Sequence, residues 1–349
     1  MRALTHLEWN CATGGLEVAK AFADRIRGKN VLITGVSPES ISSSIALSFA
    51  SQAAALIILA SRTKSKLEQV HKSIKVAYPD VHVKIVLMDL LSQESVKNAA
   101  NEVSQLTGRL DIIINNAGFL TKQRQTTKEG IEGQFGANHI GHFLLTNLLM
   151  RQLLSSASSS TPGATRVINL TSLGYQITPV RFSDYNLEKR NEDIPEEERH
   201  GQLLPAFEKG SADGYNGWVA YGQSKTANIL FSVGINEKFG PKGVKSYAVH
   251  PGLVWSGMSH GLDAEEEATL KQISNFEKNH DQGASTVMVA ALDPALNKPK
   301  GVLLHDCQMW DALPYATDPK IAERLWNLSK TLVQKYFELG EEGNGNEKL

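Results

Sequence analysis

The sequence has few cysteines and no excess of charge of either sign. Only Cys11 and Cys307 are present among 349 residues, so a disulfide framework is excluded, and neither cysteine has metal-ligand spacing around it. A reducing compartment and no metal site are therefore expected. Lys and Arg number 36 and Asp and Glu 37, which argues against a broad electrostatic grip on nucleic acid or anionic lipid. The hydrophobic fraction of 41% excludes a disordered chain.

Long hydrophobic runs are also missing. The longest apolar stretch, Ala53–Ala60, is far below the ~20 residues that a membrane helix needs. The first fifteen residues contain His6, Glu8 and Asn10 where a secretory signal has its apolar segment. We therefore expect a cytoplasmic protein with no integral membrane span.

Short β-branched runs alternate with helical patterns along most of the chain, which is typical of a parallel sheet covered by helices on both faces. We predict a single doubly wound α/β domain of the Rossmann type at residues 29–310, with a seven-stranded, mainly parallel sheet flanked by helices. The expected strands are Val31–Gly35, Leu56–Ser61, Val81–Met88, Leu110–Asn115, Arg166–Thr171, Val244–His250 and Gly301–Leu304. The expected helices include Thr63–Ala77, Gln93–Leu106, Gly130–Leu154 and Val219–Phe239.

Three regions depart from this alternation. Residues 1–28 carry apolar residues at helical spacing, which predicts an amphipathic helix that packs on the domain rather than on a membrane: Leu16, Ala19, Phe22, Ala23 and Ile26. Residues 184–218 form an insertion whose charged middle is expected to be a solvated loop. Residues 311–349 are expected to form a C-terminal helix and a frayed tail.

The strongest chemical signal is Tyr221-Gly-Gln-Ser-Lys225 on the last long predicted helix. A spacing of four residues puts the phenol and the ammonium on one helix face. A nearby cation favours tyrosinate and lowers the pKa of a tyrosine, which suits the pair to proton transfer between a ketone and an alcohol. On its own this spacing is common by chance.

Further polar and glycine residues follow the predicted strands. Thr34-Gly35 ends the first strand, Asn115 to Gly118 ends the fourth, Ser172 ends the fifth and Pro251-Gly252 follows the sixth. The carboxyl ends of the strands in an open α/β sheet share one crevice, so these residues are expected to converge.

Taken together, the motifs resemble the short-chain dehydrogenase/reductase family from about Lys29 to Trp310. The phrases FGANHIGHFLLTNLL, YGQSKTANILF and HPGLVWSGM are most similar to its retinol-dehydrogenase and WW-domain-oxidoreductase branch. The phrases VLITGVSP and YATDPKIAERLWNLSK resemble fungal members of that branch.

The resemblance implies a catalytic set. It makes Tyr221 the general acid when a ketone is reduced, with Lys225 holding the nicotinamide ribose and lowering the pKa of the tyrosine. It makes Ser172 a hydrogen-bond donor to the substrate oxygen, and Asn138 the holder of a water that links the lysine to solvent. The implied cofactor contacts are Gly35, Ser37, Ser42, Arg62, Lys66, Asp89, Asn115, Gly118, Tyr221, Lys225, Val254 and Ser256.

The cofactor is expected to be NADP(H) rather than NAD. Arg62 falls at the end of the second strand, where an acidic residue would bind the ribose of NAD. An arginine there suits the 2′-phosphate of NADP, with Thr63, Lys64 and Lys66 nearby.

One departure from the family pattern concerns the phosphate loop after the first strand, where only Gly35 remains of the family's glycines. Ser42 replaces the last glycine, and Glu39 adds a negative charge near the expected phosphates. The serines Ser37 to Ser44 offer hydroxyl and backbone donors at a helix N-terminus. Two outcomes stay open: retained cofactor binding, or a drift toward non-redox chemistry.

The expected function is an NADP-dependent interconversion of a ketone and a secondary alcohol on a lipophilic small molecule, in fungal secondary metabolism. The alternatives are a dehydratase, epimerase or cyclase of the same fold, and a non-catalytic binding protein. The segment from about Leu253 to Gln282 is expected to gate the site, and a homodimer is possible through the helices that carry Asn138 and Tyr221. The candidates for the pocket wall are Leu173, Gly174, Tyr175, Trp218, Trp255 and Met258.

Overall fold

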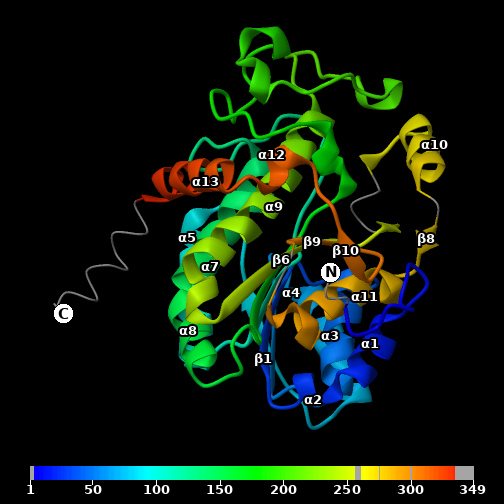
Figure 1. Ribbon diagram of the computed structural model, residues 1–349, viewed down its shortest axis with the longest axis vertical. Helices are drawn as coiled ribbons and strands as arrows, with labels where there is room; N and C mark the ends of the chain where they lie inside the picture. Colours follow the sequence, from blue (N-terminus) through cyan, green and yellow to red (C-terminus); the bar gives the residue numbers. More distant parts are fainter. Residues whose placement is uncertain (1–3, 256–260, 275, 299–300, 335–349) are drawn as a thin grey trace, which may run out of the picture.

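The computed structural model describes residues 4–255, 261–274, 276–298 and 301–334. Its centre is an eight-stranded sheet with the order β10-β9-β6-β5-β4-β1-β2-β3, in which every pairing is parallel except that of β10 with β9 (Figure 1). The strands are β1 (Asn30–Thr34), β2 (Leu56–Ser61), β3 (His82–Leu87), β4 (Ile112–Asn115), β5 (Thr165–Leu170), β6 (Val244–His250), β9 (Leu303–His305) and β10 (Gln308–Trp310).

The prediction of seven strands is wrong by one, because β9 and β10 form a hairpin. Its two turn residues, Asp306 and Cys307, have φ of 48° and 62°, the left-handed conformation of a tight two-residue hairpin. Neither is a glycine or an asparagine, so the usual turn signal is absent. The buried Cys307 is held by a hydrogen bond from its backbone N–H to Thr286 Oγ1 at 3.0 Å. A separate two-stranded sheet pairs β7 (Leu253–Val254) with β8 (Glu277–Lys278).

Helices cover both faces of the main sheet, as the alternating pattern predicts (Figure 1). Two apolar clusters fill the spaces between the sheet and its helices, one on each face. The first layer of helices comprises α1 (Gly15–Ala21), α3 (Ile41–Ser51), α4 (Lys64–Ala77) and α11 (His280–Leu292). The second layer comprises α5 (Gln93–Leu106), α7 (Gly141–Leu148), α8 (Met150–Ser158) and α9 (Gly217–Phe239), with α12 (Pro314–Thr317) and α13 (Pro319–Leu332) packed on α9.

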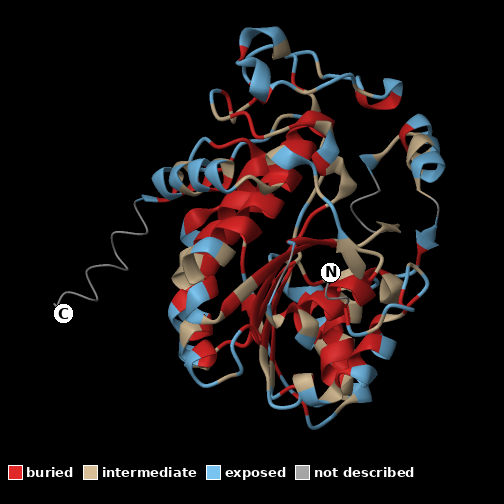
Figure 2. Ribbon diagram, viewed as in Figure 1, coloured by how far each residue is buried: buried red, intermediate tan, exposed pale blue. Residues whose placement is uncertain are grey.

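Helix α9 is buried along most of its length (Figure 2). Every residue from Gly217 to Ile235 is buried, because the sheet lies on one side of the helix and α13, α12 and the 3₁₀ turn Leu173–Ile177 lie on the other. A helix surrounded in this way shows no polar face. It is a rigid support for Tyr221 and Lys225, which stand in its first turns.

The predicted helix Gly130–Leu154 is interrupted. The chain forms α6 (Gly133–Phe135), a π-helical turn at Gly136–Ile140, then α7 and α8. Single π-turns inside α-helices are frequently found at functional sites. This turn contains Asn138, which is fully buried.

The N-terminal segment packs on the domain. Its helices are α1 and α2 (Ala23–Ile26), and the side chains of Val18, Ala19, Phe22 and Ile26 are buried. Helix α1 contacts α3 and α11, so most of the predicted apolar face is covered by protein, but Leu16 of that face is 45% exposed. No helix in the described part of the chain is both long and apolar enough to cross a bilayer.

The charged middle of the insertion is mostly exposed, as expected of a solvated loop, but Glu198 is an exception. Glu198 is 2% exposed, because its carboxylate accepts hydrogen bonds from Ser183 N at 2.8 Å and Ser183 Oγ at 2.6 Å and pairs with Arg324 Nη2 at 2.9 Å. Further along, Tyr215 is fully buried and its hydroxyl donates to Glu132 Oε1 at 2.8 Å. The insertion is therefore tied to the domain by buried polar contacts. The expected frayed tail from Glu341 lies outside the described residues.

Candidate active site

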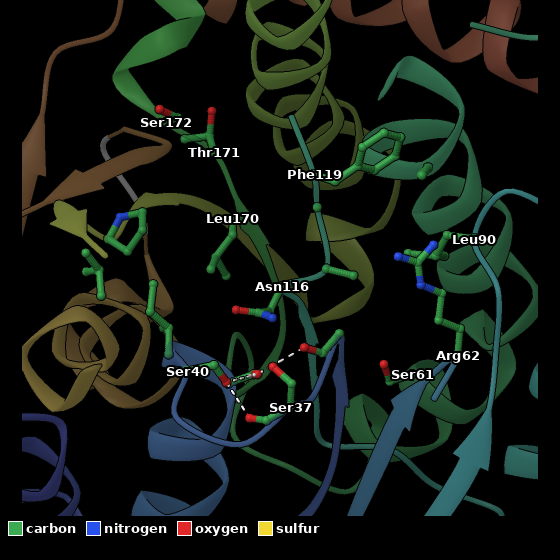
Figure 3. Close-up of a pocket in the computed structure, with 18 of the residues that line it drawn as sticks. Ser37, Ser40, Ser61, Arg62, Leu90, Asn116, Phe119, Leu170, Thr171 and Ser172 are labelled. Carbon is green, nitrogen blue, oxygen red and sulfur yellow. Dashed lines mark hydrogen bonds between the residues drawn. The ribbon is translucent and has the colours of Figure 1, made fainter. Parts of the chain in front are cut away.

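A cavity of about 430 Å³ opens at the carboxyl ends of the parallel strands (Figure 3). Figure 3 shows Arg62 and Leu90 on one side and Thr171 and Ser172 on the opposite side. The cavity brings together most of the predicted site residues: Gly35, Ser37, Ser42, Arg62, Lys66, Asp89, Gly118, Ser172, Tyr221, Lys225 and Val254. Asn115 and Asn138 stand behind its wall, and Ser256 falls among the residues that are not described.

The loop after β1 closes on itself through its serines. Ser42 Oγ donates to the Gly35 carbonyl at 3.1 Å, and Ser40 Oγ donates to the Ser37 carbonyl at 2.6 Å (Figure 3). Ser40 also caps α3, since its hydroxyl accepts from Ser43 N at 3.3 Å. The N-terminus of α3 borders the cavity, a position that favours an anion.

At the position of Gly35, only glycine fits. Its φ is +70°, and a Cβ built on it would lie 2.6 Å from Ala117 Cα. The expected negative charge of Glu39 does not reach the cavity, because Glu39 is exposed and does not belong to its lining.

Two cations border the cavity at the end of β2. Arg62 and Lys66 make no ion pair within the ranges that the structure covers, whereas Lys64 on the same helix pairs with Glu68 at 3.8 Å and does not line the cavity. Ser61 and Thr63 stand beside them in the lining. This corner therefore offers two uncompensated positive charges and two hydroxyls to an anionic group.

Tyr221 and Ser172 meet at the far end of the cavity. Burial raises the pKa of Tyr221 to about 12, and its hydrogen bond with the Ser172 side chain lowers it by less. The phenol is therefore protonated at neutral pH and suited to donate a proton. The predicted lowering of this pKa by the lysine is not what this geometry gives, since burial outweighs every other influence.

Lys225 lies beside the tyrosine, with Nζ 5.3 Å from the ring centroid of Tyr221. Its ammonium donates to the Leu170 carbonyl at 3.2 Å, and burial lowers its pKa to about 8. A Cβ on Gly118 would lie 3.2 Å from Nζ, so the loop after β4 passes close over the lysine.

Asn138 fixes that loop. Its Nδ2 donates to the Phe119 carbonyl at 3.1 Å and to Ser224 Oγ at 2.9 Å, while its Oδ1 accepts from Phe119 N at 3.0 Å. The side chain thus joins the π-helical turn, the loop after β4 and α9 around Lys225.

His142 extends this arrangement, and sequence reasoning missed it. Its Nδ1 lies 3.0 Å from the Asn138 carbonyl, which only accepts, so Nδ1 is the donor. Burial lowers the pKa of His142 to about 4, which leaves Nε2 neutral to accept from Thr34 Oγ1 at 2.9 Å. The signal in the sequence was its place four residues after Asn138, on the same helical face.

Asn115, an expected cofactor contact, does not line the cavity, and its neighbour Asn116 does. Asn115 Nδ2 donates to Thr146 Oγ1 at 3.0 Å and to Asn169 Oδ1 at 2.8 Å, so its side chain ties β4 to α7 and β5. The neighbouring Asn116 lines the cavity, and its Nδ2 donates to the Thr34 carbonyl at 2.9 Å.

A second cavity of about 760 Å³ begins where the first one ends. Ser172, Tyr221, His250, Gly252 and Val254 border both. Of the predicted wall, Leu173, Gly174 and Trp218 line it; Tyr175 and Trp255 do not, and Met258 falls outside the described residues. Tyr175 is 1% exposed because it points into the core under α12. Leu262, Leu270 and Ile273 of the expected gating segment also line it. The wall residues that were not predicted come from other segments: Cys11, Leu203, Leu204, Phe207, His305 and Trp310.

Helix α10 (Ala264–Ile273) forms one wall of the second cavity and is held by charges. Glu266 is 1% exposed, accepts from Trp218 Nε1 at 2.9 Å, and lies 2.6 Å from Lys122 Nζ. Lys209 pairs with Glu265 at the surface at 2.6 Å. The pair of the buried Glu266 with the half-buried Lys122 fixes α10 over the cavity, whereas the surface pair contributes little.

Replacing Lys122 by Met is expected to loosen α10, because the Glu266 carboxylate then loses its cation. We expect KM for an apolar substrate to rise about three- to tenfold and limited proteolysis within α10 to quicken, with kcat within about twofold of the wild type. Lys209→Met is the matched control and should leave both readouts unchanged. Equal behaviour of the two variants would show that Lys122 does not hold the helix.

The chain is similar to known proteins. Residues 29–189 match the family model of the short chain dehydrogenases. The chain is 35% identical to Oxidoreductase fscI of Fusarium equiseti, over 70% of this chain and 94% of that protein. It is 33% identical to mouse Retinol dehydrogenase 12, over 88% of this chain and 87% of that protein.

Solved structures agree in fold. An uncharacterized protein from Mycobacterium paratuberculosis matches with a TM-score of 0.61 and 25% identity, over 88% of this chain and 94% of that one. A short chain dehydrogenase from Burkholderia cenocepacia, solved in complex with NADP, matches with a TM-score of 0.58 and 20% identity, over 80% of this chain and 96% of that one. The chain therefore belongs to the short-chain dehydrogenase/reductase family, in its retinol-dehydrogenase-like branch, and is an oxidoreductase.

Proposed function

We propose that this protein is an NADP(H)-dependent reductase that interconverts a ketone and a secondary alcohol on a lipophilic small molecule. The observation that carries the proposal is the presence of Arg62 and Lys66, two cations with no ion pair among the described residues, in one cavity with the predicted catalytic residues. Those residues are Ser172, Tyr221 and Lys225. Two relatives support a fungal setting, Oxidoreductase fscI of Fusarium equiseti and Short-chain dehydrogenase/reductase prx1 of Penicillium rubens. Because the second cavity is largely apolar, we extend the proposal to secondary metabolism.

The residues of the first cavity fit a dinucleotide with a 2′-phosphate. Arg62 and Lys66 suit that phosphate, since guanidinium and ammonium groups bind phosphate oxygens. The N-terminus of α3 suits the pyrophosphate. Gly35 lies so close to Ala117 that a Cβ on Gly35 would collide with it. The absence of a side chain at Gly35 also lets the backbone approach the ligand. The serines that replace the family's glycines bond within the loop and leave the cavity open, so the loop gives no support to the non-redox alternative.

The chain's own groups would handle the proton. The nicotinamide, when bound, supplies or accepts the hydride. Ser172 donates a hydrogen bond to the substrate oxygen as negative charge develops there. Tyr221 transfers its phenolic proton to that oxygen, and its raised pKa keeps it protonated beforehand. Lys225, charged at neutral pH, stabilises the phenolate that remains.

The rate of ketone reduction is expected to depend on pH through Lys225. Its pKa of about 8 means that it is charged below that pH and neutral above it. With Tyr221 protonated up to about pH 12, we expect kcat to be constant between about pH 6 and pH 8 and to fall above pH 8. A spectrophotometric assay of NADPH consumption with apolar ketones measures this profile. A rate that rises with pH through this range would contradict the assignment of Tyr221 as the acid.

A further inference from the structure

The second cavity is not apolar throughout. One part of its wall carries His250, Lys278, His305 and Asp306, which we call the histidine–lysine–aspartate cluster. The cluster forms because β6 pairs with β9 with His250 opposite His305, and the hairpin turn then places Asp306 beside them. Lys278 arrives from β8. No residue of this cluster takes part in the chemistry described above.

The four side chains are in contact. The rings of His250 and His305 have centroids 4.7 Å apart. Lys278 Nζ lies 2.6 Å from Asp306 Oδ1, and His305 Nε2 lies 3.4 Å from the same oxygen. The Lys278 side chain is 1% exposed and runs against Gly252, whose φ is +90° and whose Cβ, if present, would lie 2.7 Å from Lys278 Cε. The chain thus fixes the lysine at the cavity wall.

Hydrogen-bonding capacity in this cluster is left unused. Within the part of the chain that the structure describes, His250 Nδ1, His305 Nδ1, Lys278 Nζ and Asp306 Oδ1 have no hydrogen-bond partner, although the lysine and the aspartate form an ion pair. Lys278 Nζ and Asp306 Oδ1 face each other in that ion pair, so the atoms without a partner among the described residues are the two imidazole Nδ1 atoms. Buried polar atoms are nearly always hydrogen-bonded, so these two nitrogens at one cavity wall indicate a ligand that completes them. Burial holds the pKa of both imidazoles below the usual range, and each neutral ring then offers one donor and one acceptor.

We propose that the histidine–lysine–aspartate cluster binds a second oxygen of the substrate, a hydroxyl or a carbonyl. This inference rests on the proposed function. The substrate class is then a hydroxyketone or a diketone on an otherwise apolar skeleton.

Three observations restrict the charge of the substrate, the position of its second oxygen and its carbon skeleton. The cluster is electrically balanced, because Lys278 is paired with Asp306, so it suits a neutral oxygen better than a carboxylate. His250 borders both cavities together with Ser172 and Tyr221, so the second oxygen lies on the skeleton near the reacting carbonyl. The wall away from the cluster is apolar and includes Leu203, Leu270 and Ile273, which suits the remaining carbon skeleton.

The test compares ketones in matched pairs, such as α-tetralone and a ring-hydroxylated α-tetralone, with purified full-length protein. Binding in the presence of NADP⁺ is measured by calorimetry, and kcat/KM is measured with NADPH. We expect the wild type to favour the hydroxylated member at least about tenfold in both. His305→Phe should abolish that preference while NADPH affinity stays within about twofold, because His305 does not line the first cavity. His305→Asn should retain part of it, because the asparagine amide reaches where Nδ1 stood.

The matched control is His82→Phe, an exposed histidine in β3 at the opposite edge of the sheet. It should behave as the wild type. A preference that survives His305→Phe contradicts the inference. A protein that binds NADPH but neither binds nor reduces any hydroxylated ketone better than its plain partner contradicts it as well. Both of those results leave the proposed function standing. A protein that binds no NADPH overturns the proposed function instead.

Discussion

Tyr221→Phe is expected to lower kcat for ketone reduction about 10²- to 10⁴-fold, the range that general acid catalysis contributes. The phenylalanine keeps the ring in its place, edge-on to Trp218 with centroids 6.2 Å apart, and removes only the hydroxyl. The variant then lacks the phenolic proton that the wild-type protein places beside Ser172. NADPH affinity should change by less than about twofold, because the phenol belongs to the substrate end of the cavity.

Tyr315→Phe is the matched control for this variant. It removes a hydroxyl that donates to the Tyr175 carbonyl at 2.9 Å, away from both cavities. Stopped-flow and steady-state assays of both variants separate loss of chemistry from loss of folding. A Tyr221→Phe protein that keeps more than about a tenth of the wild-type rate would show that another group supplies the proton.

Arg62→Glu is expected to exchange the cofactor preference. The wild-type guanidinium has no carboxylate partner in the region described and lines the cavity with Lys66. A glutamate there repels a 2′-phosphate and accepts hydrogen bonds from the ribose hydroxyls of NADH. Since a hydrogen bond to a charged group contributes about 1.5–3 kcal/mol, NADPH affinity should fall about ten- to a hundredfold, while NADH affinity holds or improves.

Lys64→Glu makes the same charge reversal two residues along and outside the cavity lining. It separates a local contact from a general electrostatic effect. Fluorescence titration of each variant with NADPH and NADH gives the four affinities required. Equal losses in the two variants would mean that Arg62 acts only through its charge at long range.

Regular repeating features of the chain could be predicted from the sequence. The strands that are apolar on both faces and the helices between them follow from hydrophobic period, and β2, α5 and β6 have the predicted bounds. The convergence of Gly35, Ser172 and Tyr221 follows from the rule that carboxyl ends of parallel strands meet. The hydrophobic period depends only on neighbouring residues, and the rule for parallel strands holds for all such sheets. Both can therefore be applied to a single sequence.

Contacts between distant segments could not be predicted in the same way. The Asp306-Cys307 turn adopts left-handed backbone without glycine, because Thr286 and the strand pairing hold it. The Asn115 side chain lies in the core because it hydrogen-bonds to Thr146 and Asn169 on other elements. The next residue, Asn116, lines the cavity instead. The wall of the second cavity depends on how the insertion and α10 fold back over α9.

We propose that the first cavity, with its serine-closed phosphate loop, is an NADP(H) site. Fluorescence titration of the wild-type protein with NADPH and, separately, with NADH measures this binding. We predict micromolar binding of NADPH and binding of NADH that is weaker by at least about tenfold. A folded protein that binds neither dinucleotide at millimolar concentration, or that binds NADH as tightly as NADPH, would contradict the claim.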